Sequence, residues 1–220
     1  MGILEPVFAS PLSVWLIPNV DADFSGKLGL QPRQRSIGLI TADNDDATYV
    51  SIDEATKKAD VEVVYARSFY AGARHSSGPL SGEVMAVLAG PDPDEVRAGL
   101  QAAVQYLKNE AVWYSANGDG SIAFFAHLVS RTGTYLSKLC GTAPGTPVAY
   151  LVAPPMEGMV ALDAALKAAA VRIAVLTPPP SETNYMGAIL TGDQSACEAA
   201  TAAFRDAVLE VARKPFNFQE

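Results

Sequence analysis

Three aspartates lie close together directly after an apolar run, and their carboxylates could bind a cation. The segment Thr41-Ala42-Asp43-Asn44-Asp45-Asp46-Ala47-Thr48 begins at the last residue of the β-branched or apolar run 37–41. An EF-hand calcium loop that began at Asp43 would need glycine at its sixth position, where this chain has Thr48. The residue types leave three interpretations open: a solvated acidic turn, a cation-binding pole of the protein, or a dedicated metal site.

A glutamate and a tryptophan stand at the ends of two other apolar runs. Glu83 opens one run after Ser81-Gly82, and Trp113 lies in Val112-Trp113-Tyr114. A glutamate at the rim of a sheet and a packed indole are the structural interpretations. The functional interpretation joins both residues to Thr183 and Asn184. Carboxylates, an indole face and hydroxyl or amide groups together form a receptor for a small ammonium compound that also bears a hydroxyl.

Acid–base catalysis has few candidate residues, because His75 and His127 are the only histidines. His127 lies in an apolar stretch, and we expect it to be a core residue. His75 lies beside Arg74 in a loop, where it could sense pH or bind a metal. The chain has no Gly-x-Ser-x-Gly, His-Glu-x-x-His, P-loop or dinucleotide-binding pattern. We therefore expect no enzyme, no cofactor and no assigned metal ligand.

The composition is that of an ordinary folded protein with an excess of acidic residues. Of 220 residues, 49% are hydrophobic and 18% are charged, and the formal net charge is −8. Nucleic acids and anionic membranes bind basic faces, so we expect neither as a partner. Cys140 and Cys197 are expected to be buried or half-buried thiols. The chain has no signal-peptide pattern and no run of about 18 apolar residues, which predicts a soluble cytoplasmic protein.

The elements that must position these residues occur twice in the chain. Residues 52–63 recur as residues 162–173, so that Asp53 matches Asp163, half a chain length later. Solenoid repeats have periods of about 20 to 50 residues. A shift of half the chain therefore predicts a duplicated domain, and two such units usually pack about a pseudo-twofold axis or build a ring.

Each copy predicts the same order of elements: strand, helix, strand, strand, helix. The first copy places the first four elements at residues 37–41, 52–59, 61–66 and 83–89. The second copy places them at residues 148–152, 160–169, 171–177 and 185–191. Further strands are expected at residues 13–20, 112–115 and 122–129. This pattern predicts an α/β (α+β) fold of ferredoxin-like type, made twice, with a strand order that the sequence does not give.

The helix that closes each copy has boundary signals in the sequence. In the first copy Asp92 can cap the helix, Pro93 suits its first position and Glu95 completes a capping box. In the second copy Asp193 is the expected cap. Each helix also carries an apolar stripe at helical spacing: Val96, Leu100, Ala103, Val104 and Leu107 in the first, and Cys197, Ala200, Phe204, Val208 and Val211 in the second.

One loop distinguishes the two copies. Gly90, before the first closing helix, matches Gly192, before the second. These two glycines are separated by fewer residues than Asp53 and Asp163 are. The copies therefore differ in length by eight residues between their second and third strands. The first copy has Phe69–Leu80 there, and the second has the shorter Pro178–Asn184. Long loops on a rigid scaffold often carry function and motion.

Five motifs distributed over the chain form a recognisable pattern: SIGLITAD (36–43), DEATK (53–57), VEVVYARS (61–68), AYLVAPP (149–155) and PPSETNY (179–185). This pattern resembles the tandem-domain shell proteins of bacterial ethanolamine-utilisation microcompartments. The resemblance implies two circularly permuted bacterial microcompartment (BMC) domains, residues 1–113 and 114–220. It also implies a structural protein of a microcompartment shell, not a catalyst.

The same resemblance implies an assembly and a ligand. The expected assembly is a homotrimer, which acts as a pseudohexameric tile beside other shell proteins and has a gated central pore. Smaller pores at the junction of the two domains would hold ethanolamine, at the positions Asp45, Asp46, Glu83, Trp113, Thr183, Asn184 and Tyr185. We hypothesise that the loops Phe69–Leu80 and Pro178–Thr183 form the gate.

Two alternatives of other kinds remain open. Pore chemistry can be re-used, so the chain could be a shell tile of another microcompartment, such as one for propanediol or choline. It could also be a ferredoxin-like sensor that binds a metabolite and signals to a partner. An enzyme is the weakest alternative, because the chain has neither a nucleophile–base pair nor a cofactor motif.

Overall fold

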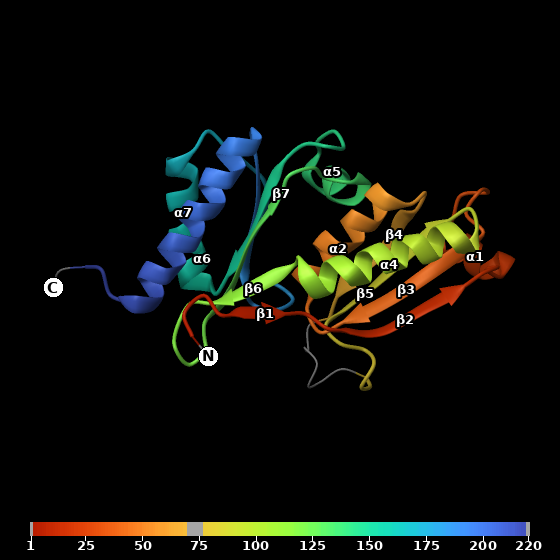
Figure 1. Cartoon of the computed structure of the whole chain (residues 1–220), viewed down its shortest axis with the longest axis horizontal. Coiled ribbons are helices and arrows are strands. Elements are labelled where there is room, and N and C mark those ends of the chain that lie inside the picture. Colours follow the sequence, from red (N-terminus) through yellow and green to blue (C-terminus); the bar gives the residue numbers. More distant parts are fainter. Residues whose placement is uncertain (1, 70–76, 219–220) are drawn as a thin grey trace. The chain divides into compact units, whose positions relative to one another are not determined.

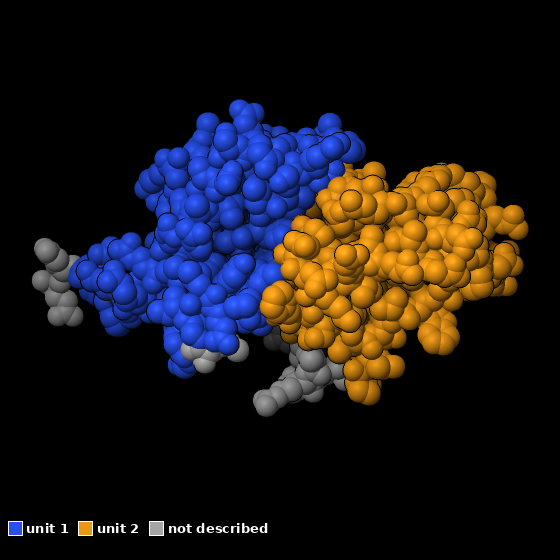
Figure 2. Space-filling model, viewed as in Figure 1, with its two compact units in different colours: residues 1–7, 112–132, 139–220 blue, residues 8–111, 133–138 orange. Residues whose placement is uncertain are grey.

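A computed structural model describes residues 2–69 and 77–218 of the chain (Figure 1). The chain forms two compact units (Figure 2). Unit 1 comprises residues 1–7, 112–132 and 139–220, and unit 2 comprises residues 8–111 and 133–138. Each unit therefore includes a short segment from the half of the sequence that otherwise builds the other unit. The predicted domain limits, 1–113 and 114–220, stay a prediction.

Unit 2 is built on a four-stranded antiparallel sheet with the strand order β2-β3-β5-β4. Its strands are β2 (Pro11–Ile17), β3 (Ser36–Ala42), β4 (Glu62–Ser68) and β5 (Val84–Gly90). Its helices are α1 (Ala22–Leu28), α2 (Asp45–Lys58) and α4 (Pro93–Asn109). Helices α2 and α4 pack against each other and against the sheet. The largest side chains that they enclose with the sheet include Ile40, Ile52, Leu88 and Leu107, whereas Ile37 lies in a separate cluster with Val87 and Ala89.

Unit 1 contains a six-stranded sheet with the strand order β1-β6-β7-β8-β10-β9. Its strands are β1 (Pro6–Phe8), β6 (Val112–Ser115), β7 (Ala123–Val129), β8 (Val148–Ala153), β9 (Arg172–Thr177) and β10 (Met186–Thr191). Its helices α6 (Pro155–Ala168) and α7 (Gln194–Arg213) pack together on the sheet. A further short helix, α5 (Thr134–Cys140), follows β7 in the chain.

The two units repeat one another in detail, which confirms the duplicated α/β fold predicted from the sequence. The order β3-α2-β4-β5-α4 recurs as β8-α6-β9-β10-α7, and the strand order β2-β3-β5-β4 recurs as β7-β8-β10-β9. Helices α2 and α6 have the same length. Each end of α6 follows the corresponding end of α2 by the same number of residues that separates Asp163 from Asp53. The register irregularities also correspond: Val64 is the extra residue of β4 opposite β5, and Ala174 is that of β9 opposite β10.

Some boundaries of the predicted elements were wrong. Helix α2 begins at Asp45 rather than at Ile52, because the Asn44 side chain accepts a hydrogen bond from the Ala47 backbone N–H and caps the helix there. Helix α6 likewise begins at Pro155 rather than Val160. The elements β1, α1 and α5, which are at most seven residues long, were not predicted.

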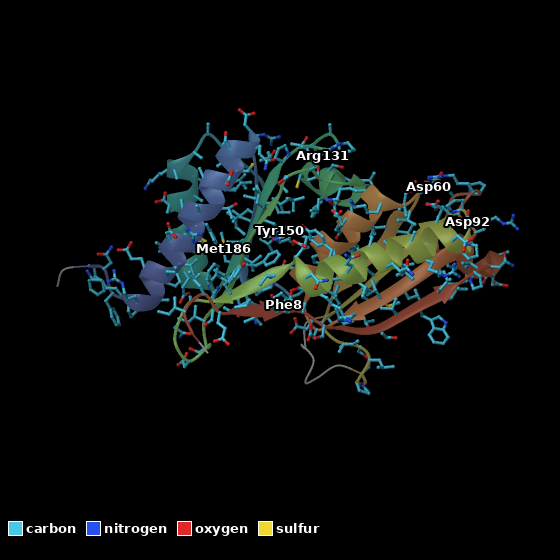
Figure 3. All side chains as sticks on the ribbon, in the orientation of Figure 1. Phe8, Asp60, Asp92, Arg131, Tyr150 and Met186 are labelled. Atoms are coloured by element: carbon cyan, nitrogen blue, oxygen red, sulfur yellow. The ribbon has the colours of Figure 1, made fainter. Side chains whose placement is uncertain are left out.

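The predicted helix caps are confirmed in position but differ in chemistry. Asp92 lies at the start of α4 (Figure 3) and its Oδ1 accepts hydrogen bonds from the N–H groups of Asp94 and Glu95, both at 2.9 Å. The Glu95 carboxylate does not complete a capping box, because Oε2 accepts a hydrogen bond from the Asp60 N–H at 2.6 Å instead. Asp193 occupies the N-cap position of α7 without a side-chain cap hydrogen bond.

The apolar stripes of α4 and α7 face the cores as predicted, with Val104 and Val211 half-buried at their margins. Cys140 and Cys197 are free thiols and both are buried, as expected. Within the described parts of the chain, no helix combines the length and the apolar character needed to cross a bilayer.

Candidate functional site

The acidic segment lies at the junction of β3 and α2, and its carboxylates have different surroundings. Asp43 Oδ1 accepts a hydrogen bond from the Ser10 N–H at 2.6 Å. Asp45 is only 6% exposed, and its two oxygens accept hydrogen bonds from the Asp46 N–H (2.8 Å) and from Ser68 Oγ (2.6 Å). The interpretation as a solvated turn is therefore wrong for Asp45, which is buried in the first turn of a helix.

Glu83 lies half-buried directly before β5, at the same end of the unit 2 sheet. Its backbone N–H donates to the Ala42 carbonyl at 2.8 Å. The preceding Gly82 has φ +62°, and a Cβ there would overlap the Ala42 carbonyl oxygen, so this approach requires glycine. Burial, followed by the negative charges of Asp45 and Asp43, raises the pKa of Glu83 to about 7.

The electrostatics of this group of carboxylates would favour a bound cation. The described residues contain no group of three or more His, Cys, Asp or Glu side chains that could hold a metal. Burial and the neighbouring Asp45 and Asp43 raise the pKa of Glu83, so the negative charge of Glu83 is unfavourable there, and a cation beside it would offset that cost. His75, the other residue considered for a metal, lies outside the described residues.

Aromatic side chains surround Trp113 in unit 1. Its indole is 7% exposed, stacks on Phe125 with ring centroids 5.5 Å apart, and meets the Tyr185 ring edge-on at 5.5 Å. The packed-indole interpretation is thus confirmed. His127 is not a core residue, because its side chain is half-buried; its ring also stacks on Phe125, with centroids 5.1 Å apart.

Thr183 and Asn184 belong to a short hydrogen-bonded loop that leads to Tyr185. The Asn184 N–H donates to the Ser181 carbonyl at 3.2 Å, and Ser181 Oγ donates to the Tyr185 carbonyl at 2.8 Å. Asn184 is exposed and has φ +61°, a left-handed conformation that asparagine tolerates better than most residues. Thr183 is half-buried, so both polar side chains remain accessible to a ligand.

The seven predicted ligand-binding residues fall into two groups. Unit 2 holds the acidic group, in which Asp45 and Glu83 interact electrostatically and Asp46 follows Asp45 in the helix. Unit 1 holds the aromatic and polar group, in which the Trp113 and Tyr185 rings are in contact and Thr183 and Asn184 directly precede Tyr185.

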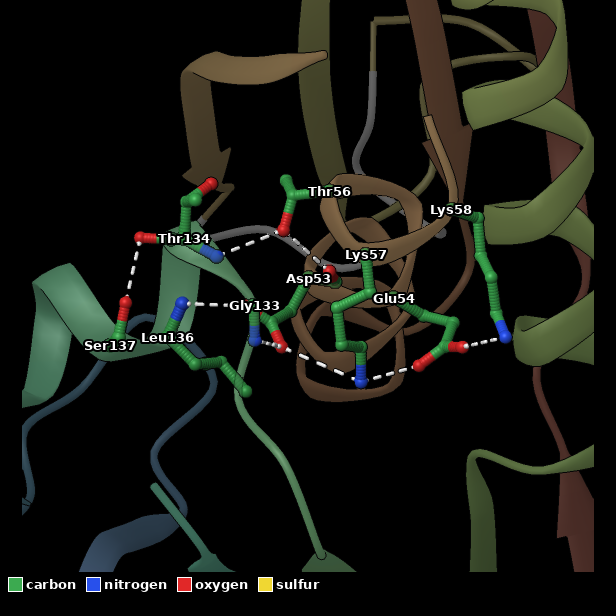
Figure 4. A network of polar contacts seen from close by, with 9 residues as sticks. All are labelled: Asp53, Glu54, Thr56, Lys57, Lys58, Gly133, Thr134, Leu136 and Ser137. Atoms are coloured by element: carbon green, nitrogen blue, oxygen red, sulfur yellow. Dashed lines mark hydrogen bonds and ion pairs between the residues drawn. The ribbon is translucent and has the colours of Figure 1, made fainter. Parts of the chain in front are cut away.

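A second polar cluster in unit 2 was not anticipated from the sequence (Figure 4). Asp53 of α2 is fully buried, and its carboxylate accepts hydrogen bonds from the N–H groups of Gly133 (2.7 Å) and Leu136 (2.8 Å). Thr56 Oγ1 accepts a third from the Thr134 N–H at 2.9 Å. Side chains of α2 therefore satisfy the free N–H groups at the start of α5.

The geometry of this contact excludes a side chain at residue 133. A Cβ on Gly133 would overlap Thr56 Oγ1 and approach the Asp53 backbone.

Lys57 Nζ lies 3.9 Å from Asp53 Oδ2 and also pairs with Glu54. The signal available in the sequence was the position of Asp53, a charged residue between the buried Ile52 and Ala55 of the helix.

Comparisons with known proteins give a consistent result. The BMC domain family matches residues 36–116 and 152–215. The chain is 54% identical to the bacterial microcompartment shell protein EutL of Escherichia coli K12 over 217 residues, which is 99% of each chain. It is 56% identical over 207 residues to EutL of Clostridium perfringens, covering 94% of this chain and 95% of the relative. A crystal structure of the ethanolamine utilization protein EutL from Leptotrichia buccalis superimposes with a TM-score of 0.96, at 56% identity, and covers 99% of this chain and all of the other.

Proposed function

The chain belongs to the BMC-domain family of bacterial microcompartment shell proteins, in the group of EutL proteins, and from this we propose that it is a non-catalytic shell tile that binds ethanolamine. The single observation that carries the proposal is the match over nearly the full chain to EutL proteins, whose names assign them to the shell and to ethanolamine utilisation. The proposed tile is a homotrimer that contacts other shell proteins, because two BMC domains per chain let three chains form six domains.

The proposed ligand site combines both groups of residues. Ethanolamine is an ammonium ion near neutral pH, and Asp45, Asp46 and Glu83 would supply the negative potential that attracts it. Trp113 and Tyr185 would supply ring surfaces, and Thr183 and Asn184 would meet the ligand hydroxyl. The buried Asp45 and the raised pKa of Glu83 support this proposal, because charges count more in a site with little water.

Calorimetric titration with ethanolamine tests the site. We expect the unmutated protein to bind, and we expect Glu83→Gln and Asp45→Asn each to weaken binding about 10- to 100-fold, the usual worth of a hydrogen bond to a charged group. Both substitutions keep the shape of the side chain. Asp94→Asn, which removes a charge from a side chain that is 89% exposed, is the matched control and should bind like the parent.

Two results would contradict parts of this proposal. Absence of binding by the unmutated protein would remove ethanolamine as the ligand and leave the shell function intact. Equal weakening by Asp94→Asn would show a general effect of net charge rather than a site.

The gated pore belongs to the same proposal. The loops Phe69–Leu80 and Pro178–Thr183 differ most between the repeats, although residues 70–76 of the first loop lie outside the described residues. The ends of that loop are anchored, since the Phe69 N–H donates to the Glu83 carbonyl and Thr41 Oγ1 donates to the Leu80 carbonyl. Identical loop conformations in crystals grown with and without ethanolamine would count against a gate.

A further inference from the structure

The buried carboxylate of Asp45 is connected to a chain of hydrogen bonds that includes two residues outside the proposed ligand site. Ser68 Oγ lies 2.6 Å from Asp45 Oδ2 and 2.7 Å from the Tyr49 hydroxyl oxygen. An ionised carboxylate only accepts hydrogen bonds, so Ser68 donates its one hydroxyl hydrogen to Asp45. The Tyr49 hydroxyl therefore donates to Ser68 Oγ, and the hydrogen bonds run in one direction, from Tyr49 through Ser68 to Asp45.

These hydrogen bonds act on a carboxylate that has little contact with water. Asp45 is buried, and its other oxygen, Oδ1, accepts a hydrogen bond from the Asp46 N–H at 2.8 Å. A carboxylate in such a place costs free energy unless hydrogen-bond donors replace the lost water. Hydrogen bonds to an ionised group are short and strong, and neighbouring bonds in a chain strengthen one another. The hydroxyl groups of Tyr49 and Ser68 thus stabilise the Asp45 carboxylate and fix its orientation.

The hydrogen-bonded chain lies beside the second carboxylate of the acidic group. Ser68, the last residue of β4, is paired in register with Val84, which directly follows Glu83. The next N–H, that of Phe69, donates to the Glu83 carbonyl at 2.7 Å. After burial, the charge of Asp45 is the largest cause that raises the pKa of Glu83 to about 7. A change at Ser68 would therefore act on the acidic group through Asp45.

The other repeat shows that the fold itself does not require this chain of hydrogen bonds. Helix α6 and strand β9 repeat α2 and β4, and the register of β9 on β10 repeats that of β4 on β5. The three equivalent positions there hold Pro155, Met159 and Pro178. None of these side chains has an O–H group or a carboxylate. The same fold forms in unit 1 without them, which points to a role that is specific to unit 2.

From these contacts we propose that Ser68 is a positioning residue of the ligand site, which, backed by Tyr49, holds the Asp45 carboxylate charged and in one orientation for the ammonium group of the ligand. The proposal rests on the proposed ethanolamine site and adds two residues that act without contacting the ligand. The alternative is that the same hydrogen bonds only attach α2 to β4. They would then contribute to stability and not to affinity.

The ethanolamine affinity of variants that lack one hydroxyl group tests this role. In calorimetric titrations we expect Ser68→Ala to weaken binding about tenfold and Tyr49→Phe, which acts one bond further away, about threefold. Ser68→Thr keeps the hydroxyl and should bind within about twofold of the parent. Ser51→Ala is the matched control and should bind like the parent, because the Ser51 hydroxyl donates at the same distance, 2.6 Å, to the Ala47 carbonyl within α2.

A double-mutant cycle separates positioning from a structural role. Asp45→Asn removes the charge that Ser68 positions, so adding Ser68→Ala to Asp45→Asn should weaken binding by less than about twofold more. A purely structural effect of Ser68→Ala would be the same factor in both backgrounds. Ethanolamine is a small, highly soluble compound, so NMR titration can measure the weak binding of these variants.

Two results would overturn the role of Ser68 and leave the ethanolamine site standing. The first is a parent that binds ethanolamine while the Ser68→Ala and Tyr49→Phe proteins bind it equally well. The second is a loss caused by Ser68→Ala that is as large in the Asp45→Asn background as in the parent. A parent that does not bind ethanolamine would overturn both proposals.

Discussion

At the scale of single residues, Glu83 stands out because its surroundings disfavour the ionised form of its carboxyl group. Its carboxyl is half-buried, and two further carboxylates, those of Asp45 and Asp43, raise its pKa together with desolvation. A protein that needed only a stable fold would gain by an uncharged residue at this position. The unfavourable charge is consistent with a cationic ligand that compensates it, which is the role proposed above.

The pH dependence of stability should report this residue. The pKa of Glu83 in the folded chain, about 7, lies above its ordinary value of 4.5. The fold therefore favours the neutral acid, so the stabilising contribution is complete below pH 4.5 and is lost as the pH rises through 7. Relative to Glu83→Gln, the unmutated protein should lose on the order of 1 kcal/mol between about pH 5 and pH 8, after allowance for solvent screening. Urea unfolding at one protein concentration, without ligand, measures this; parallel pH curves for the two proteins would refute it.

Asp53 is the residue whose removal should cost most stability among the polar groups described. Asp53→Ala leaves the N–H groups of Gly133 and Leu136 without their acceptor in a buried place, and we expect a loss of about 2–4 kcal/mol in the free energy of unfolding. Asp206→Ala removes an exposed carboxylate that pairs with Arg205 and should cost less than about 1 kcal/mol. Equal losses in the two variants would mean that the buried contact contributes little.

At the scale of elements, the two closing helices offer a matched comparison of caps. Asp92 accepts two backbone hydrogen bonds at the start of α4, whereas Asp193 occupies the same position of α7 without a side-chain cap hydrogen bond. Asp92→Ala should therefore destabilise the protein by about 1 kcal/mol and Asp193→Ala by only a few tenths. Thermal or urea unfolding of both variants checks this, and a larger effect of Asp193→Ala would contradict it.

The elements also show what the sequence could reveal. Internal repetition and apolar periodicity predicted both β-α-β-β-α units, because the same order of strands and helices could be assigned independently in each half of the chain. The start of α2 was missed because Asn44-Asp45-Asp46 is equally typical of a turn and of a helix N-terminus. The role of Asp53 could not be predicted, since its acceptor function depends on backbone N–H groups 80 and 83 residues later in the chain, which carry no side-chain signature.

The residues of the candidate site were predicted from their types and from the family resemblance, and their surroundings were not predicted. Asp45, Glu83 and Trp113 were identified because charged or large aromatic residues at the ends of apolar runs are unusual. Their burial and pairings depend on neighbours such as Ser68 and Phe125, which are distant in sequence. The grouping of all seven residues around one ligand stays a prediction.

At the scale of the whole molecule, a shell tile and a metabolite sensor differ in how copies associate. We expect the unmutated protein to form trimers that join edge to edge into extended sheets, which electron microscopy would show directly and native mass measurement would support. A discrete soluble dimer that never forms sheets would favour the sensor instead.

Each unit contains a short segment from the other half of the sequence. Strand β1, near the N-terminus, joins the sheet of unit 1, and residues 133–138, from the second half, belong to unit 2. The repeats are therefore not detachable modules. A gene cut between codons 113 and 114 would yield two fragments. In the first, Asp53 lacks its hydrogen-bond donors Gly133 and Leu136, and the second lacks the outer strand β1 and the first two residues of β6. Expressed together, such fragments should recombine into one particle, so this shell component could be delivered as a split protein whose assembly depends on the presence of both pieces.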